Sequence, residues 1–507
     1  MFIKAFFNSG LSTTITLVFS FLTNLFFVRI CGLELFGQYS YILSYVTVYF
    51  SLASLGIISS FTREATWYSS HNKGISGFLT LVVLFILVSN IILALPAYYL
   101  HKYYLVQYIQ IGDRTLYSIL ALLFINILFL GPSTLMLGIF ESNQRMKYPL
   151  IINIIISVFK LLILSMFFVV SLNISSVIFI IYLIPNILLF VLMYYFISRE
   201  FDIKFTLNIN IVDYEHFKSL IKYSIILFPV AFSELIISNF SSILLSKNES
   251  FENIGIFRVL FGIFVLINTF QSFLGKALLP IFSRFFYDDN LNSANLYFNF
   301  FFKVAIILTS PILIFIALFS KEIFHFYNIN SSQATWYLYI FLITNYLMVG
   351  SFVGSFLNSF NRPKIVSISL LIGATANFLV LFFGVKFWGI AAAVISILIC
   401  YLTMQGFLFY FLIKKLKTPV DLGLYFFNFL CSFVIFILLK SVYFYTNSIS
   451  FTIVLLPLFI LFYYRLLQKR YLFNEVEKNK ILRIVSNIEN VRLKFIIFQF
   501  FSLVGFN

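Results

Sequence analysis

The sequence predicts an all-α polytopic membrane protein with about fourteen transmembrane helices, and three observations predict it. The 507 residues are 61% hydrophobic and only 10% charged, which would leave large apolar patches on a water-soluble surface. The chain contains about fourteen apolar runs close to the roughly 20 residues that a helix needs to cross the hydrocarbon. Sustained alternation of apolar and polar residues, typical of a membrane barrel, is absent, so helices must satisfy the backbone.

The first apolar run, at about 11–30, has no convincing signal-peptide cleavage site and leads directly into further spans. We expect it to be kept as the first helix. Positive charge gathers in alternate short loops, such as 143–149 and 414–419. This positive-inside pattern predicts that both termini are cytoplasmic. Because it accounts for the net charge of +16, we expect no nucleic-acid partner.

Sulfur and imidazole side chains give no sign of a metal site or a disulfide framework. Cys31, Cys400 and Cys431 are isolated in apolar surroundings, and the four His residues lie in different loops. The segment around Leu274 lacks the glycine and the hydroxyl residue of a phosphate-binding loop, so we expect no ATPase activity. We expect no cofactor, although transport coupled to an H⁺ or Na⁺ gradient remains open.

An internal repeat is visible when the chain is compared with itself. At nearly one offset, acidic, glycine and amide residues of the first half fall on identical residues of the second half. The pairs are Glu34 and Glu252, Gly37 and Gly255, Asn126 and Asn345, and Gly131 and Gly350. Several matches at one offset indicate two copies of a single six-helix lobe.

The repeat predicts the domain organisation. We expect one lobe at 1–198, a polar cytoplasmic linker at 199–218 and the second lobe at 219–413, followed by two further helices at 414–467. The basic amphipathic tail at 468–507 is expected to lie on the anionic inner leaflet or to bind a partner. Each lobe has an even number of spans, so the copies have the same orientation, with a substrate cleft and alternating access between them.

The run at 255–283 carries two cations inside an apolar segment. Arg258 and Lys276 are five turns apart and therefore lie on one helix face. The same face, and the equivalent face of the run at 38–61, carry small hydroxyl side chains. These residues are Ser40, Ser44, Thr47 and Ser51 in the first copy and Thr269 and Ser272 in the second. The repeated stripe favours a water-filled cleft that the cations face, with close packing between helices as the alternative.

The first helix carries a further hydroxyl stripe, which includes Ser20 and Thr23. Its counterpart in the second lobe carries Glu234, the only acid near the middle of a predicted span. A titratable acid at that depth indicates coupling or gating. The alternative is a salt bridge to a cation such as Lys160 or Lys303.

Three more cations are candidates for the cleft. Lys160 and Lys303 lie deep in their predicted spans, where a structural ion pair or snorkelling is the alternative. Arg63, at the inner end of the run at 38–61, is either a cleft cation or an inside-positive anchor.

Three segments resemble a known family. The hairpin Cys31–Glu64, with Gly37, Tyr39 and a Thr62-Arg63 pair, resembles the first hairpin of bacterial polysaccharide flippases of the multidrug/oligosaccharidyl-lipid/polysaccharide exporter superfamily. Ile254–Arg284 is similar to the equivalent hairpin of the second lobe. The stretch 360–396 is similar to helices 11 and 12. Together these segments extend the resemblance over about residues 1–415.

The resemblance implies an activity and its partners. Such a protein moves an undecaprenyl-pyrophosphate-linked oligosaccharide, for instance an O-antigen unit, across the bacterial cytoplasmic (inner) membrane by alternating access. A pyrophosphate needs cations in a low-dielectric cleft, and Arg258, Lys276, Arg63, Lys160 and Lys303 are the candidates. Membrane lipids, glycosyltransferases and a polysaccharide polymerase are the expected partners.

Two other functions stay open. A drug/cation antiporter of the same superfamily would need a more acidic cleft than this sequence offers. A membrane glycosyltransferase or O-antigen polymerase would need catalytic groups on sizeable outward loops, whereas the predicted loops are short.

Overall fold

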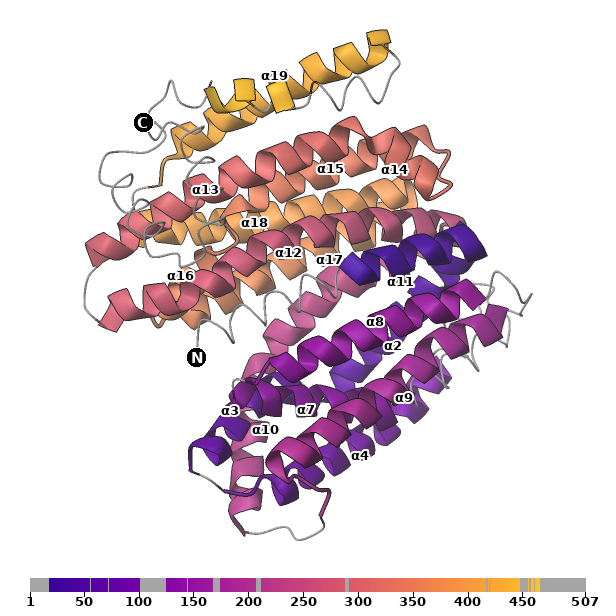
Figure 1. Cartoon of the computed structure of the whole chain (residues 1–507), viewed down its shortest axis with the longest axis vertical. Helices are drawn as coiled ribbons and strands as arrows, with labels where there is room; N and C mark the ends of the chain where they lie inside the picture. The colour runs from indigo at the N-terminus through magenta and orange to yellow at the C-terminus, as the bar shows by residue number, and fades with distance from the viewer. Residues whose placement is uncertain are drawn as a thin grey trace. The chain divides into compact units, whose positions relative to one another are not determined.

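The computed structural model describes residues 18–54, 56–71, 73–100, 125–143, 145–166, 174–206, 211–287, 291–415, 418, 420–446, 455, 457–459 and 461–465. Within these ranges the chain is almost entirely helical and contains no strand (Figure 1). Ten of the described helices are long and apolar enough to cross a membrane, and Val18–Cys31 and Leu128–Ser142 are shorter apolar helices. The all-α polytopic architecture is therefore confirmed. The number of about fourteen spans stays a prediction, because several predicted spans extend beyond the described residues.

The described chain divides into two compact units. The first contains the described residues up to Thr269, together with 326–330 and 370–403. Its helices are α2 (Leu33–Ser54), α3 (Ile57–Ser70), α4 (Ser76–Leu100), η2 (Asn126–Leu130), α7 (Gly131–Ser142), α8 (Lys147–Met166), α9 (Ile174–Phe201), α10 (Ile211–Leu235), η3 (Ile236–Phe240) and α11 (Ser241–Leu245). The long helix α12 (Phe251–Tyr287) begins in this unit.

The second unit holds the rest of α12 and α13 (Leu291–Leu318), α14 (Ser320–Phe326), α15 (Ser332–Leu347), η4 (Met348–Gly350), α16 (Val353–Ser359) and α19 (Leu422–Thr446). Helices α17 (Pro363–Trp388) and α18 (Ile390–Lys415) contribute to both units. The first unit thus takes residues from both repeats, whereas the described residues of the second unit come from the second repeat and from the chain that follows it. The predicted lobe boundaries at 198 and 219 remain a prediction.

In the first unit, α2 and α12 cross at the two glycines that the repeat pairs. A Cβ atom added to Gly37 would overlap the carbonyl oxygen of Phe251, and one added to Gly255 would overlap the carbonyl oxygen of Leu33. Leu33 and Phe251 are themselves equivalent in the repeat, so each copy makes the same contact with the other, as in a two-fold symmetric interface. Only glycine allows two helix backbones to approach this closely.

The predicted span at 38–61 is not one helix. It breaks at Gly56, which has a φ of 74° in the left-handed region that favours glycine. The backbone of α10 lies close to this break, because an added Cβ at Gly56 would be 3.3 Å from the carbonyl oxygen of Ser224. The expectation of an unbroken helix was wrong because periodicity does not register a single glycine turn. The break starts α3, which packs against α10.

Polar contacts fasten α3 to α10 along a seam on the side of the linker. The Ser60 and Ser224 hydroxyls are 2.5 Å apart and buried. Nearer the start of α10, the buried Glu64 carboxylate contacts His216 Nδ1 at 2.7 Å and accepts a hydrogen bond from Ser219. Tyr68 donates to Asp213 at 2.6 Å. The seam therefore joins α3, at the end of the first helical hairpin, to the N-terminal half of α10.

In the second unit, buried polar groups attach the C-terminal helices to α13 and α15. Asn428 of α19 accepts a hydrogen bond from Ser310 at 2.9 Å and donates one to Tyr463 at 2.6 Å. The hydroxyl of Tyr346 donates to the carbonyl oxygen of Tyr425. Because these partners satisfy one another away from water, α19 and Tyr463 are packed into this unit. The predicted pair of extra helices at 414–467 extends beyond the described residues and stays a prediction.

Replacing Gly37 or Gly255 by Ala should destabilise the protein by about 1–3 kcal/mol, because the two backbones must move apart to admit a methyl group. Thermal unfolding of the purified protein in detergent measures the change. Gly406→Ala is the matched control, since an added Cβ there meets nothing within 4 Å and alanine favours the helix. Equal melting temperatures for Gly37→Ala, Gly406→Ala and wild type would contradict the crossing.

Candidate functional site

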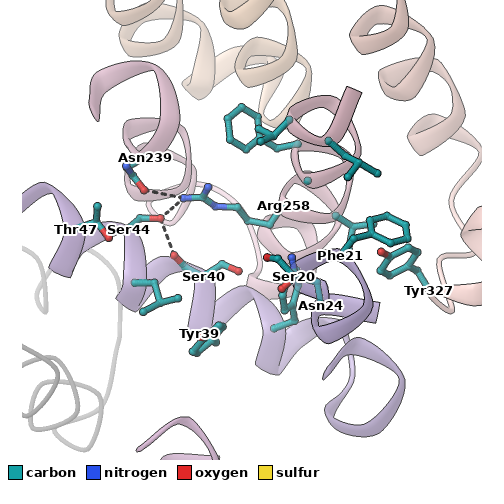
Figure 2. Close-up of a pocket in the computed structure, with 17 residues that line it drawn as sticks. Ser20, Phe21, Asn24, Tyr39, Ser40, Ser44, Thr47, Asn239, Arg258 and Tyr327 are labelled. Carbon is teal, nitrogen blue, oxygen red and sulfur yellow. Dashed lines mark hydrogen bonds between the residues drawn. The ribbon is translucent and has the colours of Figure 1, made fainter. Parts of the chain in front are cut away.

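A cavity of about 330 Å³ lies in the first unit, directly beyond the glycine crossing. Arg258 and Ser40 each come one helical turn after their glycine, and both line the cavity. The helix Val18–Cys31, α2, η3, α12 and Tyr327 form its walls (Figure 2). The polar residues of the lining are Ser20, Asn24, Tyr39, Ser40, Ser44, Thr47, Asn239, Arg258 and Tyr327. The volume is at the lower end of the roughly 300–1,000 Å³ of ligand pockets.

The two copies of the repeat contribute equivalent positions to this pocket but different chemistry. Ser40 in the first copy corresponds to Arg258 in the second, and Ser44 corresponds to Gly262; all four line the pocket. The first copy therefore supplies hydroxyl groups, and the second supplies a cation and open space. The two copies thus place equivalent positions around the pocket, but only the second copy places a charge there.

The guanidinium of Arg258 is held by neutral acceptors. It donates to the carbonyl oxygen of Ser238 at 3.1 Å and to the Ser44 hydroxyl, and lies 3.5 Å from Asn239 Oδ1 (Figure 2). Its Nε–H group is buried without a hydrogen-bond partner among the described residues. Across the described chain, none of the ion pairs involves Arg258. Arg258 is therefore fixed in direction while its charge is not balanced by a carboxylate of the described chain.

Helix η3 brings two of these acceptors to Arg258. Ser238 and Asn239 both belong to η3, a π-helical turn between α10 and α11. Such turns are rare, and they occur frequently at functional sites because they redirect side chains and backbone groups. The local change of helix geometry at η3 thus supplies two of the three groups that orient the cation.

The predicted hydroxyl stripe enters the pocket only in part. Ser40, Ser44 and Thr47 line it, whereas Ser51 does not. Thr269 also lies outside the lining, and its hydroxyl bonds back to the carbonyl oxygen of Val265 at 2.9 Å. Lys276 and Ser272 belong to α12, but their side chains lie outside the described structure.

The other predicted cleft cations are absent from the pocket lining. Arg63 is exposed, 4.4 Å above the Tyr223 ring and 3.9 Å from Glu64, so it belongs to the α3–α10 seam. Lys160 lies half-buried in α8, and Lys303 lies in α13 of the second unit. Within the described chain, the pocket has Arg258 as its one charged lining residue.

Glu234 lies at the end of α10, just before the π-helical turn. Its side chain is exposed in the isolated chain, and it forms no ion pair with a residue that the structure describes. Neither salt bridge named as the alternative, to Lys160 or to Lys303, is among the ion pairs of the described residues. The Ser238 hydroxyl donates to the Glu234 carbonyl oxygen at 2.7 Å. Glu234 therefore lies one turn before Ser238, the residue whose carbonyl oxygen accepts a hydrogen bond from Arg258.

Three polar residues of the pocket escaped the sequence prediction: Asn24, Asn239 and Tyr327. Asn24 lies one turn after Ser20 and extends the hydroxyl stripe of the first helix, so the spacing contained a signal for it. Asn239 faces the pocket within a π-helical turn, which the regular periodicity of an α-helix does not predict. Tyr327 lies in the non-helical segment after α14, where no periodic pattern exists.

Comparison with protein families decides the identity. Residues 2–286, more than half of the chain, match the family model described as polysaccharide biosynthesis protein. The chain belongs to this family. The resemblance inferred from the hairpin motifs is thereby confirmed. A search of the curated proteins returns no match.

Several solved structures share the fold of this chain. The lipid II flippase MurJ in an inward closed conformation matches with a TM-score of 0.69 and 16% identity, over 91% of this chain and 99% of that chain. An inward-facing multidrug transporter of the MATE family matches with a TM-score of 0.59 and 13% identity, over 80% of this chain and 95% of that one. A superfamily transporter from Pyrococcus furiosus matches with a TM-score of 0.56, 14% identity and coverage of 82% and 97%. Family and fold are thus of the transporter and flippase type.

Proposed function

We propose that this protein is a flippase that carries an undecaprenyl-pyrophosphate-linked oligosaccharide, such as an O-antigen repeat unit, across the bacterial cytoplasmic membrane. Both termini lie in the cytoplasm in this proposal. The observation that carries it is the environment of Arg258, a cation in a pocket of neutral polar groups with no carboxylate in the described lining. Because no carboxylate of the described lining neutralises this cation, an anionic ligand would bind to it favourably.

The chemistry of a guanidinium suits a lipid pyrophosphate. Its planar fork of N–H donors can bind two phosphate oxygens at once, and charge-assisted hydrogen bonds are about twice as strong as neutral ones. Coulomb attraction also increases in the low-dielectric surroundings of a membrane protein. Because Ser238 and Ser44 already orient Arg258, little ordering remains to be done when the anion binds. The polyprenyl tail can stay in lipid throughout.

The competing functions are less well supported by the pocket. A drug/cation antiporter needs an anion where its ligand binds, whereas the described lining contains Arg258 and neutral residues. A glycosyltransferase or polymerase needs a general base or a nucleophile close to the bound sugar, and no Asp, Glu, His or Cys belongs to the described lining. In the flippase proposal, glycosyltransferases make the substrate and a polymerase uses the product.

Replacing Arg258 by Gln should weaken binding of undecaprenyl pyrophosphate by roughly 10- to 100-fold, because a hydrogen bond to a charged group contributes about 1.5–3 kcal/mol. Binding to the purified protein in nanodiscs measures this, and flipping in proteoliposomes should fall with it. Arg258→Lys keeps the charge but not the planar fork of donors, so its affinity should lie between those of wild type and Arg258→Gln. Thr269→Val is the matched control, since this residue of the same helix lies outside the pocket. Unchanged affinity in Arg258→Gln would refute the anion site.

We further propose that Glu234 couples transport to an H⁺ or Na⁺ gradient. Its carboxylate forms no ion pair with a residue that the structure describes, so no described cation competes with a coupling ion for it. Glu234→Gln keeps the shape and removes the charge, so it should abolish gradient-stimulated flipping in proteoliposomes while leaving lipid binding unchanged. If an ion gradient stimulates flipping by Glu234→Gln as much as flipping by wild type, Glu234 has no coupling role.

Alternating access requires the α3–α10 seam to part when the linker side opens. The buried hydroxyls of Ser60 and Ser224 are close enough to be replaced by a disulfide. In a background without the native cysteines, Ser60→Cys/Ser224→Cys should lose flipping on oxidation with copper phenanthroline and recover it on reduction. Each single-cysteine variant controls for oxidation damage. A cross-linked protein that flips at the wild-type rate would show that the seam stays closed during transport.

A further inference from the structure

The pocket has two chemically different ends. Arg258, Ser44 and Asn239 gather at one end, and Ser20, Phe21, Asn24 and Tyr327 gather away from the guanidinium (Figure 2). The second end comes from the helix Val18–Cys31 and from the segment 326–330, which belongs to the same compact unit. Its side chains are two neutral polar groups and two aromatic rings.

The polar groups of this second end are available for a ligand. Most hydroxyl side chains in the described helices bond back to their own backbone, as Thr23 does to the carbonyl oxygen of Phe19 at 2.7 Å. Ser20 and Asn24 line the cavity but form no side-chain hydrogen bond with a described residue. An amide and a hydroxyl together offer donors and acceptors to the same ligand.

The aromatic wall beside them is held in place. The Tyr327 side chain is only 2% exposed, and its ring meets Phe21 edge-on with the centroids 6.0 Å apart. Arg29 Nε donates to the carbonyl oxygen of Phe326 at 2.7 Å, which ties this segment to the first helix. The ring is therefore fixed at the cavity wall before any ligand binds.

We propose that this end is a subsite for an uncharged pyranose, the sugar attached directly to the pyrophosphate that Arg258 binds. Sugar hydroxyls match the free amide and hydroxyl groups of Asn24 and Ser20. The apolar C–H face of a pyranose suits the ring of Tyr327, and the lack of a charged residue at this end selects against uronic acids. The cavity of about 330 Å³ takes the first sugar, and the remaining sugars lie outside it. This inference rests on the proposed function.

The test compares bare undecaprenyl pyrophosphate with the same lipid carrying glucose, galactose or N-acetylglucosamine, measured by binding to the full-length protein in nanodiscs. Wild type should bind at least one glycosylated lipid about 10-fold more tightly than the bare lipid, a difference of about 1.4 kcal/mol. Asn24→Leu and Tyr327→Leu should lose this preference, because they lower the affinity for the glycosylated lipid more than the affinity for the bare lipid. Tyr327→Phe, which keeps the ring, should retain most of it.

The outcomes separate the two proposals. If wild type binds the bare lipid but shows no preference for any glycosylated lipid, the subsite is wrong and the anion site stands. The subsite is equally wrong if Asn24→Leu and Tyr327→Leu keep the preference, or if they lower the affinity for the bare and the glycosylated lipid by the same factor. If wild type and Arg258→Gln bind the bare lipid equally, the proposed function itself fails. Melting temperatures of all variants establish that each is folded.

Discussion

The arrangement of the pocket depends on one close approach, the crossing of α2 and α12 at Gly37 and Gly255. Each glycine accommodates the carbonyl oxygen of the other copy's helix, so no larger residue fits without separating the two backbones. One turn further, Ser40 and Arg258 line the same cavity, and the Ser44 hydroxyl reaches the guanidinium. A wider crossing would remove that contact. The backbone contact therefore sets the electrostatics of the site.

The two equivalent helices contribute matching positions to the wall of the cavity, but the residues at those positions differ. The first copy provides hydroxyls and the second provides Arg258 and the open space beside Gly262. The π-helical turn η3 adds the Ser238 carbonyl, which orients the cation without neutralising it. An oriented but unneutralised cation attracts an anion strongly, because the desolvation and ordering have already taken place in the folded protein. This is the physical basis for the proposal that Arg258 binds the pyrophosphate.

The sequence predicted the features that repeat or recur with the helical period. The membrane architecture, the equivalence of Gly37 and Gly255, and the placement of Ser40, Ser44 and Thr47 beside Arg258 all follow from spacing. Features that depend on local departures from the α-helix were missed: the break at Gly56 and the position of Asn239 in η3. Arg63 and Lys160 do not line this cavity, and their predicted role in a cleft stays a prediction. A charge pattern alone does not say which helices become neighbours.

The central claim is that Arg258 and its neutral partners form the binding site of the lipid pyrophosphate. An experimental structure of the full-length protein with undecaprenyl pyrophosphate in nanodiscs tests it most directly. We predict density for the two phosphate groups in the cavity, within hydrogen-bond distance of the Arg258 guanidinium and beside Ser40 and Thr47. Phosphate density at Arg63, Lys160 or Lys303 with this cavity empty would contradict the claim and assign the anion to another part of the chain.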